Sequence, residues 1–168
     1  VTEDHSALRF EIMRTDSLGV RQGGTTGQKI DLPELPLRRA DGSPNDALVA
    51  AHAALHGRTV NIVDAYAQEG FDFSGTRAFD QRTGYRSQSF LTVPMTDHQG
   101  ELIGVLQLLN ALDPATGKVV AFSNADQSLT ESLASQAAIA LSNRLLITQL
   151  ERLFESFVKL INVAIDEK

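Results

Sequence analysis

The sequence predicts an α+β fold, in which antiparallel strands form a central sheet and one long helix ends the chain. Three observations support this prediction. Residues 7–13 alternate between apolar and polar side chains, which is typical of a half-buried strand. Residues 87–95 and 101–110 are apolar stretches separated by a short polar turn, which is typical of a β-hairpin. Residues 123–166 contain neither glycine nor proline and therefore predict one helix, about 60 Å long.

The first half of the chain holds one strand, a long loop, a helix and a second strand. After the strand at 7–13, residues 14–42 show no periodicity and are rich in glycine and proline, which predicts a long loop. Asn45 is a favourable N-cap and Gly57 a favourable terminator, so we expect a helix between them that ends near His56. Residues 59–63 then predict a short strand.

The second half holds the hairpin and the long helix. The strand at 101–110 is apolar on both faces, which predicts a central strand covered on both sides. A short strand is expected at 119–122. Ser123 and Asp126 have the spacing of a capping box, so the last helix is expected to begin there.

The last helix has two parts with different apolar patterns. Its first part carries small and mixed residues, as in a helix that lies on a sheet, whereas its second part carries a regular apolar seam with heptad spacing. We therefore divide the chain into a globular domain at 1–145 and a coiled-coil helix at 146–168, which continues from residue 124. The seam predicts a parallel homodimer, and its residues are Ile147, Leu150, Phe154, Phe157 and Ile161.

The composition describes a globular domain and excludes several functions. A chain of 168 residues, 42% hydrophobic and 21% charged, can form one domain with a substantial core. The absence of cysteine excludes disulfides, thiolate catalysis and metal sites with cysteine ligands. The net charge of −6 disfavours nucleic acids and anionic membranes as partners.

The hydropathy and the first residues bear on the location of the protein. No apolar run reaches the roughly 18 residues that a bilayer span needs, and the first ten residues do not resemble a signal peptide. We therefore expect a cytoplasmic protein with no membrane partner. The first residue is valine rather than methionine, so we interpret the chain as a piece of a longer protein.

Two groups of residues are candidates for a metal site and for a small-molecule pocket. His52 and His56 are one helical turn apart, a spacing that suits a metal, but no third ligand with suitable spacing is evident, so we expect neither a metal nor another cofactor. No catalytic constellation is evident, so the chain itself is not expected to be an enzyme. Residues 64–86 hold five of the ten aromatic residues among polar side chains, as in a lining of a small-molecule pocket, although these aromatics could equally complete the core.

Most of the chain resembles a GAF domain, a sensory module related to PAS domains. The resemblance rests on TVNIVDAY at 59–66, FDFSGTRAFDQRTGYRSQSFLTVPM at 71–95, GELIGVLQLLNA at 100–111 and FSNADQSLTESLASQAAIALSNR at 122–144. It implies a central antiparallel sheet of about six strands, with helices on one face and pocket loops on the other. It also implies a helix and a first strand ahead of residue 7, which are missing or truncated here. By this resemblance residues 1–145 are the GAF domain, with a sensory role, and residues 146–168 are a signalling helix.

The resemblance also suggests where a ligand would bind and what it would regulate. The sequence is most similar to GAF domains that precede bacterial HD-GYP phosphodiesterases, which act on cyclic-di-GMP. LERLFESFVKLINVAIDEK, at 150–168, resembles the connector to such an output domain, a metal-dependent phosphohydrolase that this chain lacks. The pocket positions that the resemblance implies for an unknown small molecule are Asn61, Phe71, Phe73, Phe79, Tyr85, Arg86, Ser89 and Thr92.

Two family ligands fit this sequence poorly. GAF domains that bind cyclic nucleotides carry an Asn-Lys…Phe…Asp-Glu signature, but Ala111 and Gln127 stand here in place of the lysine and the glutamate. A covalently attached bilin would need a cysteine, which the chain lacks. Two hypotheses therefore remain open: a sensor that signals through the last helix, and a dimerisation scaffold that binds no ligand.

Overall fold

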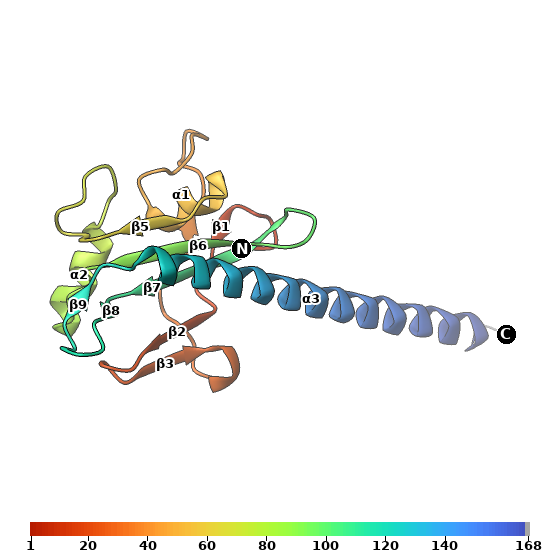
Figure 1. Cartoon of the computed structure of the whole chain (residues 1–168). Coiled ribbons are helices and arrows are strands. Elements are labelled where there is room, and N and C mark those ends of the chain that lie inside the picture. Colours follow the sequence, from red (N-terminus) through yellow and green to blue (C-terminus); the bar gives the residue numbers. More distant parts are fainter. Residues whose placement is uncertain (167–168) are drawn as a thin grey trace.

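The computed structural model describes residues 1–166, and the side chains as far as Asn162. Figure 1 shows a small body of short elements from which one long helix projects. The elements are β1 (Ala7–Leu8), β2 (Ile12–Thr15), β3 (Val20–Gly23), the 3-10 turn η1 (Gly24–Thr26), β4 (Leu35–Pro36), α1 (Val49–His56), β5 (Val60–Ile62), α2 (Ser74–Thr83), β6 (Phe90–Thr96), β7 (Leu102–Leu109), β8 (Ala111–Leu112), β9 (Val119–Val120) and α3 (Asn124–Asp166).

The central sheet has three antiparallel strands in the order β5-β6-β7. The predicted hairpin is confirmed, because β6 pairs with β7 from Phe90 opposite Leu109 to Thr96 opposite Leu102, with an irregularity near Met95. The central strand is β6, however, and β7 lies at the edge of this sheet. The prediction that 101–110 is central was wrong, because partial cover by helices on both faces is enough to explain its two apolar faces.

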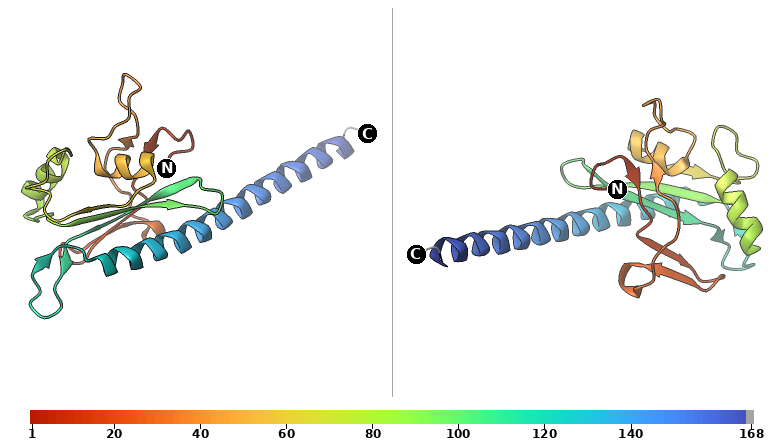
Figure 2. Two further views of the ribbon diagram at one scale, coloured as in Figure 1. Left: turned by 45° about the horizontal axis from the view of Figure 1, so that its top comes forward. Right: turned by 180° about the vertical axis from the view of Figure 1, so that it is seen from behind.

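Two layers cover the central sheet, one on each face (Figure 2). Alternate residues of β6 point to opposite faces. Phe90 packs with Val49 of α1, whereas Leu91 and Val93 pack with Ala134 of α3. The arrangement confirms the expected α+β class, with the long helix on one face and the short helices and loops on the other.

The sheet is smaller than the expected six strands. The other strands of the described chain form three separate pairs, β1 with β4, β2 with β3 and β8 with β9. Residues 7–13 do not form one strand: Ala7 and Leu8 are buried, but Phe10 is 37% and Ile12 73% exposed. The alternating pattern does mark extended backbone, but its last residues belong to β2, which pairs with β3 away from the core.

The long loop predicted at 14–42 contains short strands that the sequence did not reveal. Gly23 ends the β2–β3 hairpin with φ +74°, and a Cβ at this position would collide with the backbone oxygen of Glu11. The glycines that suggested a loop therefore permit a tight crossing of two backbone segments. β9 falls within the predicted strand at 119–122.

Helix α1 begins later than predicted. Asn45 does not cap it, because its side chain donates a hydrogen bond to the oxygen of Pro36 and its amide bonds to Leu37. The helix starts at Val49 and ends as predicted at Gly57, which adopts φ +60°. Its alanines at 51, 53 and 54 are buried, so one side of α1 lies closely against the sheet.

Helix α3 begins as predicted. The Ser123 hydroxyl accepts a hydrogen bond from the Asp126 amide, and the Asp126 carboxylate accepts bonds from the Ser123 amide and hydroxyl. These bonds lower the pKa of Asp126 below its ordinary value. Ala134 and Ala138 are fully buried against the sheet, and beyond Ser142 the helix leaves the body.

Loss of this cap is expected to weaken the fold modestly. Ser123→Ala should lower the free energy of unfolding by about 1 kcal/mol, because orphan amides at the helix start lose their acceptor. Urea unfolding followed by circular dichroism measures the change. Ser128→Ala, an exposed position of the same helix, is the control and should leave stability unchanged or slightly raised. An equal effect of both variants would contradict the cap.

Candidate functional site

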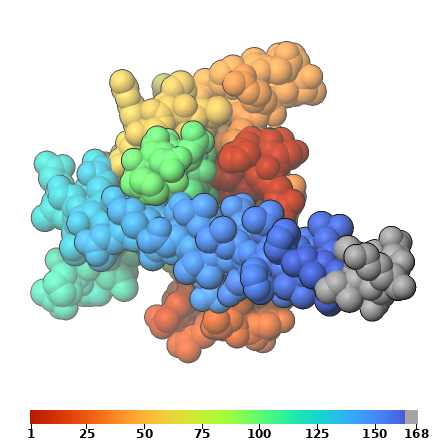
Figure 3. Space-filling model, turned by 90° about the vertical axis from the view of Figure 1, so that its right-hand side faces the viewer, coloured from red at the N-terminus to blue at the C-terminus, as the bar shows by residue number. Residues whose placement is uncertain are grey.

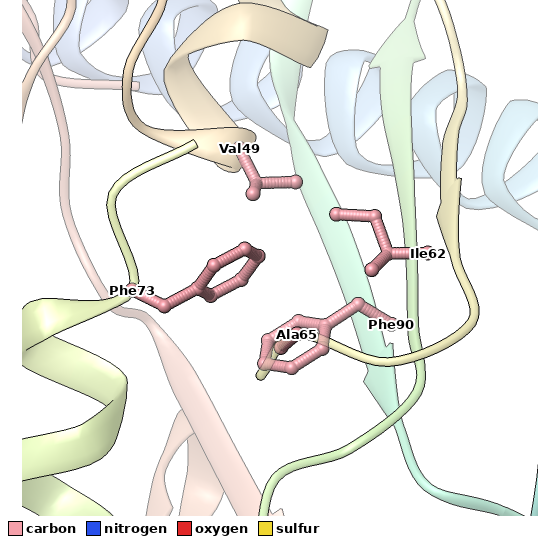
Figure 4. Packing of buried hydrophobic residues seen from close by; sticks show 5 residues of the cluster. All are labelled: Val49, Ile62, Ala65, Phe73 and Phe90. Carbon is pink, nitrogen blue, oxygen red and sulfur yellow. The ribbon is translucent and has the colours of Figure 1, made fainter. Parts of the chain in front are cut away.

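The face of the sheet below α1 and α2 has an apolar centre. Figure 4 shows Phe73, Phe90 and Ile62 pointing toward one another, together with Val49 and Ala65. Phe73, one of the predicted pocket residues, is only 4% exposed. Phe71 packs against the edge of this cluster. These two aromatics therefore complete the core, which is one of the two roles considered from the sequence.

Thr92 lies on the same face and is also enclosed. Its side chain is fully buried in β6, and its hydroxyl accepts a hydrogen bond of 2.9 Å from the side-chain amide of Gln107 in β7. This bond satisfies the hydroxyl within the chain. A ligand would reach Thr92 only after the surrounding side chains had moved.

A buried carboxylate fixes α2 against the sheet. Asp80 is 4% exposed and accepts hydrogen bonds from the Tyr66 hydroxyl (2.8 Å), the Ser87 amide (2.7 Å) and the Ser87 hydroxyl (2.7 Å). α2 ends one turn later at Gly84, with φ +71°. The network thus holds α2, the segment around Tyr66 and the entry to β6 in one arrangement.

Two arginines surround the Tyr66 ring at the surface. The guanidinium carbon of Arg86 lies 4.2 Å from the ring centre and that of Arg77 lies 5.5 Å from it. The hydrogen bond to Asp80, with burial, raises the pKa of Tyr66 above its ordinary value, so the phenol stays neutral. Phe79 and Tyr85, two predicted pocket residues, are half-buried on and just after α2. This region combines positive charge with aromatic surface, which suits an anion that carries a ring.

Two predicted pocket residues lie elsewhere. Asn61 donates hydrogen bonds to the Phe122 oxygen and the Gln127 side chain, so it binds β5 to the start of α3 on the opposite face. Ser89 is fully buried, and its hydroxyl accepts a hydrogen bond from the Ala111 amide. Both side chains connect parts of the fold.

The structure therefore brings together only part of the predicted pocket. Phe79, Tyr85 and Arg86 lie near the accessible surface of α2. Phe73, Ser89 and Thr92 are buried, Phe71 lies at the edge of the core, and Asn61 is exposed on the opposite face of the sheet. Sequence reasoning missed Tyr66 as a stacking partner, Arg77 as a second cation and Asp80 as the carboxylate that binds the Tyr66 hydroxyl. The one sequence feature that could have pointed to these three residues was the polar and aromatic composition of 64–86.

An open hollow lies on the α3 side of the sheet. It measures about 390 Å³, and none of the eight predicted pocket residues lines it. Its lining residues are Gly57, Arg58, Thr59, Val93, Pro94, Thr96, Gln127, Glu131 and Ser135.

The residues of the cyclic-nucleotide signature hold strand ends in place. Asn110 adopts φ +57°; its amide group donates to the Arg86 oxygen (2.7 Å), and its side-chain oxygen accepts from the Gln88 amide (2.7 Å). The ion pair of the signature cannot form with Asp126, because Ala111 carries no charge.

The far part of α3 exposes an apolar surface. The five seam residues, Ile147, Leu150, Phe154, Phe157 and Ile161, are 44 to 68% exposed. They lie on the side of the helix opposite Ala134 and Ala138, which face the sheet, because successive residues are separated by about 100°. In Figure 3 the blue helix lies in front of the body, and no other segment covers it on the side that faces the viewer. Residues 167–168, the last of the predicted signalling helix, lie outside the described residues.

Despite the length of α3, no helix among residues 1–166 has the apolar stretch that crossing a membrane requires.

Comparison with known proteins identifies relatives of the chain. It is 35% identical over 95 residues to "Dual 3',5'-cyclic-AMP and -GMP phosphodiesterase 11" of Drosophila melanogaster, which covers 56% of this chain. It is 30% identical over 118 residues to "Dual 3',5'-cyclic-AMP and -GMP phosphodiesterase 11A" of Takifugu rubripes, which covers 70% of this chain. The alignments span only 6% and 12% of these two relatives.

Two solved structures are similar to the chain, and a family comparison gives its classification. A GAF domain from a Coxiella burnetii phosphoenolpyruvate-protein phosphotransferase superposes with a TM-score of 0.46 at 18% identity, covering 76% of this chain and 66% of that one. The corresponding Acinetobacter domain gives 0.45 at 19% identity, covering 75% and 64%. The sequence model of the GAF domain matches residues 6–141. That match spans most of the chain, which therefore belongs to the GAF domain family.

Proposed function

We propose that this GAF domain is the regulatory sensory part of a phosphodiesterase, and that it passes the binding of a small molecule along α3 to an output domain. The observation that carries the proposal is the continuity of α3. The helix packs on the sheet through Ala134 and Ala138 and continues without interruption to the exposed seam. A shift of the helix on the sheet would therefore also displace the seam residues.

The proposed binding region is the surface of α2 and the segment that follows it. Arg86 and Arg77 would attract an anionic group, and Tyr85 and Phe79 would contact its apolar part. A ligand can change the position of α3 only by its difference in affinity for two arrangements of the domain. Asn61 and Asn110 are suitable intermediaries, since they join the sheet to α3 and to the α2 side respectively.

The proposed output is a phosphodiesterase domain outside this chain. The names of the two curated relatives support a phosphodiesterase. The HD-GYP class, a metal-dependent phosphohydrolase acting on cyclic-di-GMP, is supported by the resemblance of the sequence to GAF domains that precede such enzymes and by the resemblance of residues 150–168 to their connector. Catalysis would reside in that domain, and the GAF domain would regulate it.

A ligand-free dimerisation scaffold is the second candidate. It is favoured by the burial of Phe73, Ser89 and Thr92, since the two hydroxyls have hydrogen-bond partners within the chain and the ring is in the core. In this case the domain would act by pairing two chains through the seam and not by binding a ligand. The two candidates share the parallel dimer and differ in whether a ligand binds.

A ligand screen separates the two candidates. We expect an anionic compound among cyclic mononucleotides, cyclic dinucleotides and small aromatic acids to raise the melting temperature and to saturate in calorimetry. Arg86→Ala should weaken its binding about tenfold or more, since a charge-assisted contact contributes about 1.5–3 kcal/mol. Arg39→Ala, an exposed arginine elsewhere, should have no effect. No saturation at millimolar concentration would favour the scaffold and contradict the sensor.

The relay can be measured directly because the chain has no native cysteine. Gln136→Cys places a single spin label on the outer side of α3. A parallel dimer brings the two labels close together, whereas an antiparallel pair centred on Phe154 would separate them by about 50 Å. A sensor should change the distance distribution when ligand is added. An unchanged distribution with saturating ligand would contradict the relay.

A further inference from the structure

Three potential metal ligands, Asp46, His52 and His56, converge on the outer side of α1. Asp46 Oδ1 lies 2.7 Å from His56 Nε2 and 3.1 Å from His52 Nδ1. The three donor atoms all lie within 4.8 Å of one another. The sequence showed the two histidines one turn apart, but the third ligand lies outside the helix and becomes visible only in the fold.

The backbone around these residues is well fixed. The buried side of α1 holds Ala51 and Ala54 against the sheet, so His52 and His56 must project from the outer part of the helix. Asp46 is held between two anchors, because the Asn45 amide bonds to the Leu37 oxygen and the Asp72 amide bonds to the Ala47 oxygen. The three ligands are thus supplied by one helix and the fixed segment just before it.

The surroundings leave one side of the cluster open. The edge of the His52 ring meets Phe71 at 5.4 Å between ring centres, and the two imidazoles lie 4.4 Å apart. The side chains of His52, His56 and Asp46 are one-third to one-half exposed. A fourth position would therefore be available to water or to a ligand atom.

We propose that Asp46, His52 and His56 form a binding site for a divalent transition-metal ion, with Zn²⁺ as the best fit. Two imidazole nitrogens and one carboxylate oxygen form a donor set that zinc accepts, at about 2.0–2.2 Å from each atom. Magnesium and calcium prefer sets made of oxygen alone, so they are poor candidates. The donor atoms would need to move only slightly toward one another, which partly exposed side chains allow.

Hydrogen bonds hold the three groups together in the metal-free chain, since Asp46 Oδ1 lies within hydrogen-bond distance of a nitrogen of each imidazole. A bound ion would replace these hydrogen bonds by bonds to the same three atoms, which requires that neither of the two nitrogens carries a proton. The alternative is a cluster held by hydrogen bonds alone. This alternative predicts that the three side chains bind no metal ion.

Calorimetry with Zn²⁺ tests the site on the tag-free chain. We expect one ion per chain to bind, and His52→Ala, His56→Ala and Asp46→Asn each to weaken binding about tenfold or more. Co²⁺ should give visible absorption bands typical of four-coordination in the parent chain and not in the variants. His98→Ala, in the exposed hairpin turn, is the matched control and should bind as the parent does. Mg²⁺ should give no signal.

Two results would overturn the proposal. One is the absence of saturable zinc binding to the parent chain. The other is equal zinc binding by the parent and all three ligand variants, which would place the ion elsewhere. Circular dichroism establishes that each variant is folded. If His56→Ala alters the end of α1, Asp46→Asn remains informative because it changes one atom outside the helix.

Discussion

Replacing Asp80 with alanine is expected to lower the free energy of unfolding by about 3 kcal/mol or more. The carboxylate is buried and accepts three hydrogen bonds, from Tyr66 and from two groups of Ser87. Its removal leaves these donors without an acceptor in a place that water reaches poorly, and each such donor costs about 1–3 kcal/mol. α2 would also lose its main polar attachment to the sheet.

Urea unfolding gives the measurement, and two variants calibrate it. Tyr66→Phe removes one donor with its bond and should cost only about 1 kcal/mol. Asp31→Ala removes an exposed carboxylate and should change stability by less than about 0.5 kcal/mol. If Asp80→Ala were as stable as Asp31→Ala, the buried network would not be what holds α2 in place.

The local elements were predictable where one pattern determines the structure. The β6–β7 hairpin has two apolar strands with a polar turn between them, and α3 has a capping pair followed by more than forty residues without glycine or proline. In these segments local preference and tertiary packing agree. The family resemblance then added the expected arrangement of these elements, with helices on one face of the sheet and pocket loops on the other.

The sheet order was not predictable from the same patterns. Apolar residues on both faces of β7 indicate that side chains are covered, but they do not tell whether the backbone edge is paired. The burial of the side chains on the two faces of a strand and the hydrogen bonding of its two backbone edges are separate matters. Similarly, the alternation of residues 7–13 predicted a strand but could not name its partner, and that partner is β3 for the second half.

The candidate site was predictable in composition but not in geometry. The aromatic residues of 64–86 were found, yet whether a phenylalanine fills the core or lines a pocket depends on what packs against it. Phe73 meets Phe90 and is buried, whereas Phe79 stays near the surface. Asp46 and Asp80 were missed for the same reason, since their partners become neighbours only when the chain folds.

Replacing Phe154 with glutamate is expected to dissociate the proposed parallel dimer while the domain stays folded. Phe154 lies in the middle of the seam and is 68% exposed in the single chain. Burying such a side chain contributes about 2 kcal/mol in each protomer. Two glutamates facing each other in the seam would forfeit this burial and repel each other. The dissociation constant should rise by about a thousandfold, which corresponds to about 4 kcal/mol.

Sedimentation velocity over a concentration series measures this change, and Gln149→Glu is the matched control. Residue 149 lies on the side of α3 away from the seam, so the same new charge should leave the dimer intact. A parent chain that is monomeric at high micromolar concentration would contradict the dimer itself. A dimer that survives Phe154→Glu would mean that another surface pairs the chains. In that case the seam would not be the contact that pairs the two helices, and the relay through a paired seam would have to be given up.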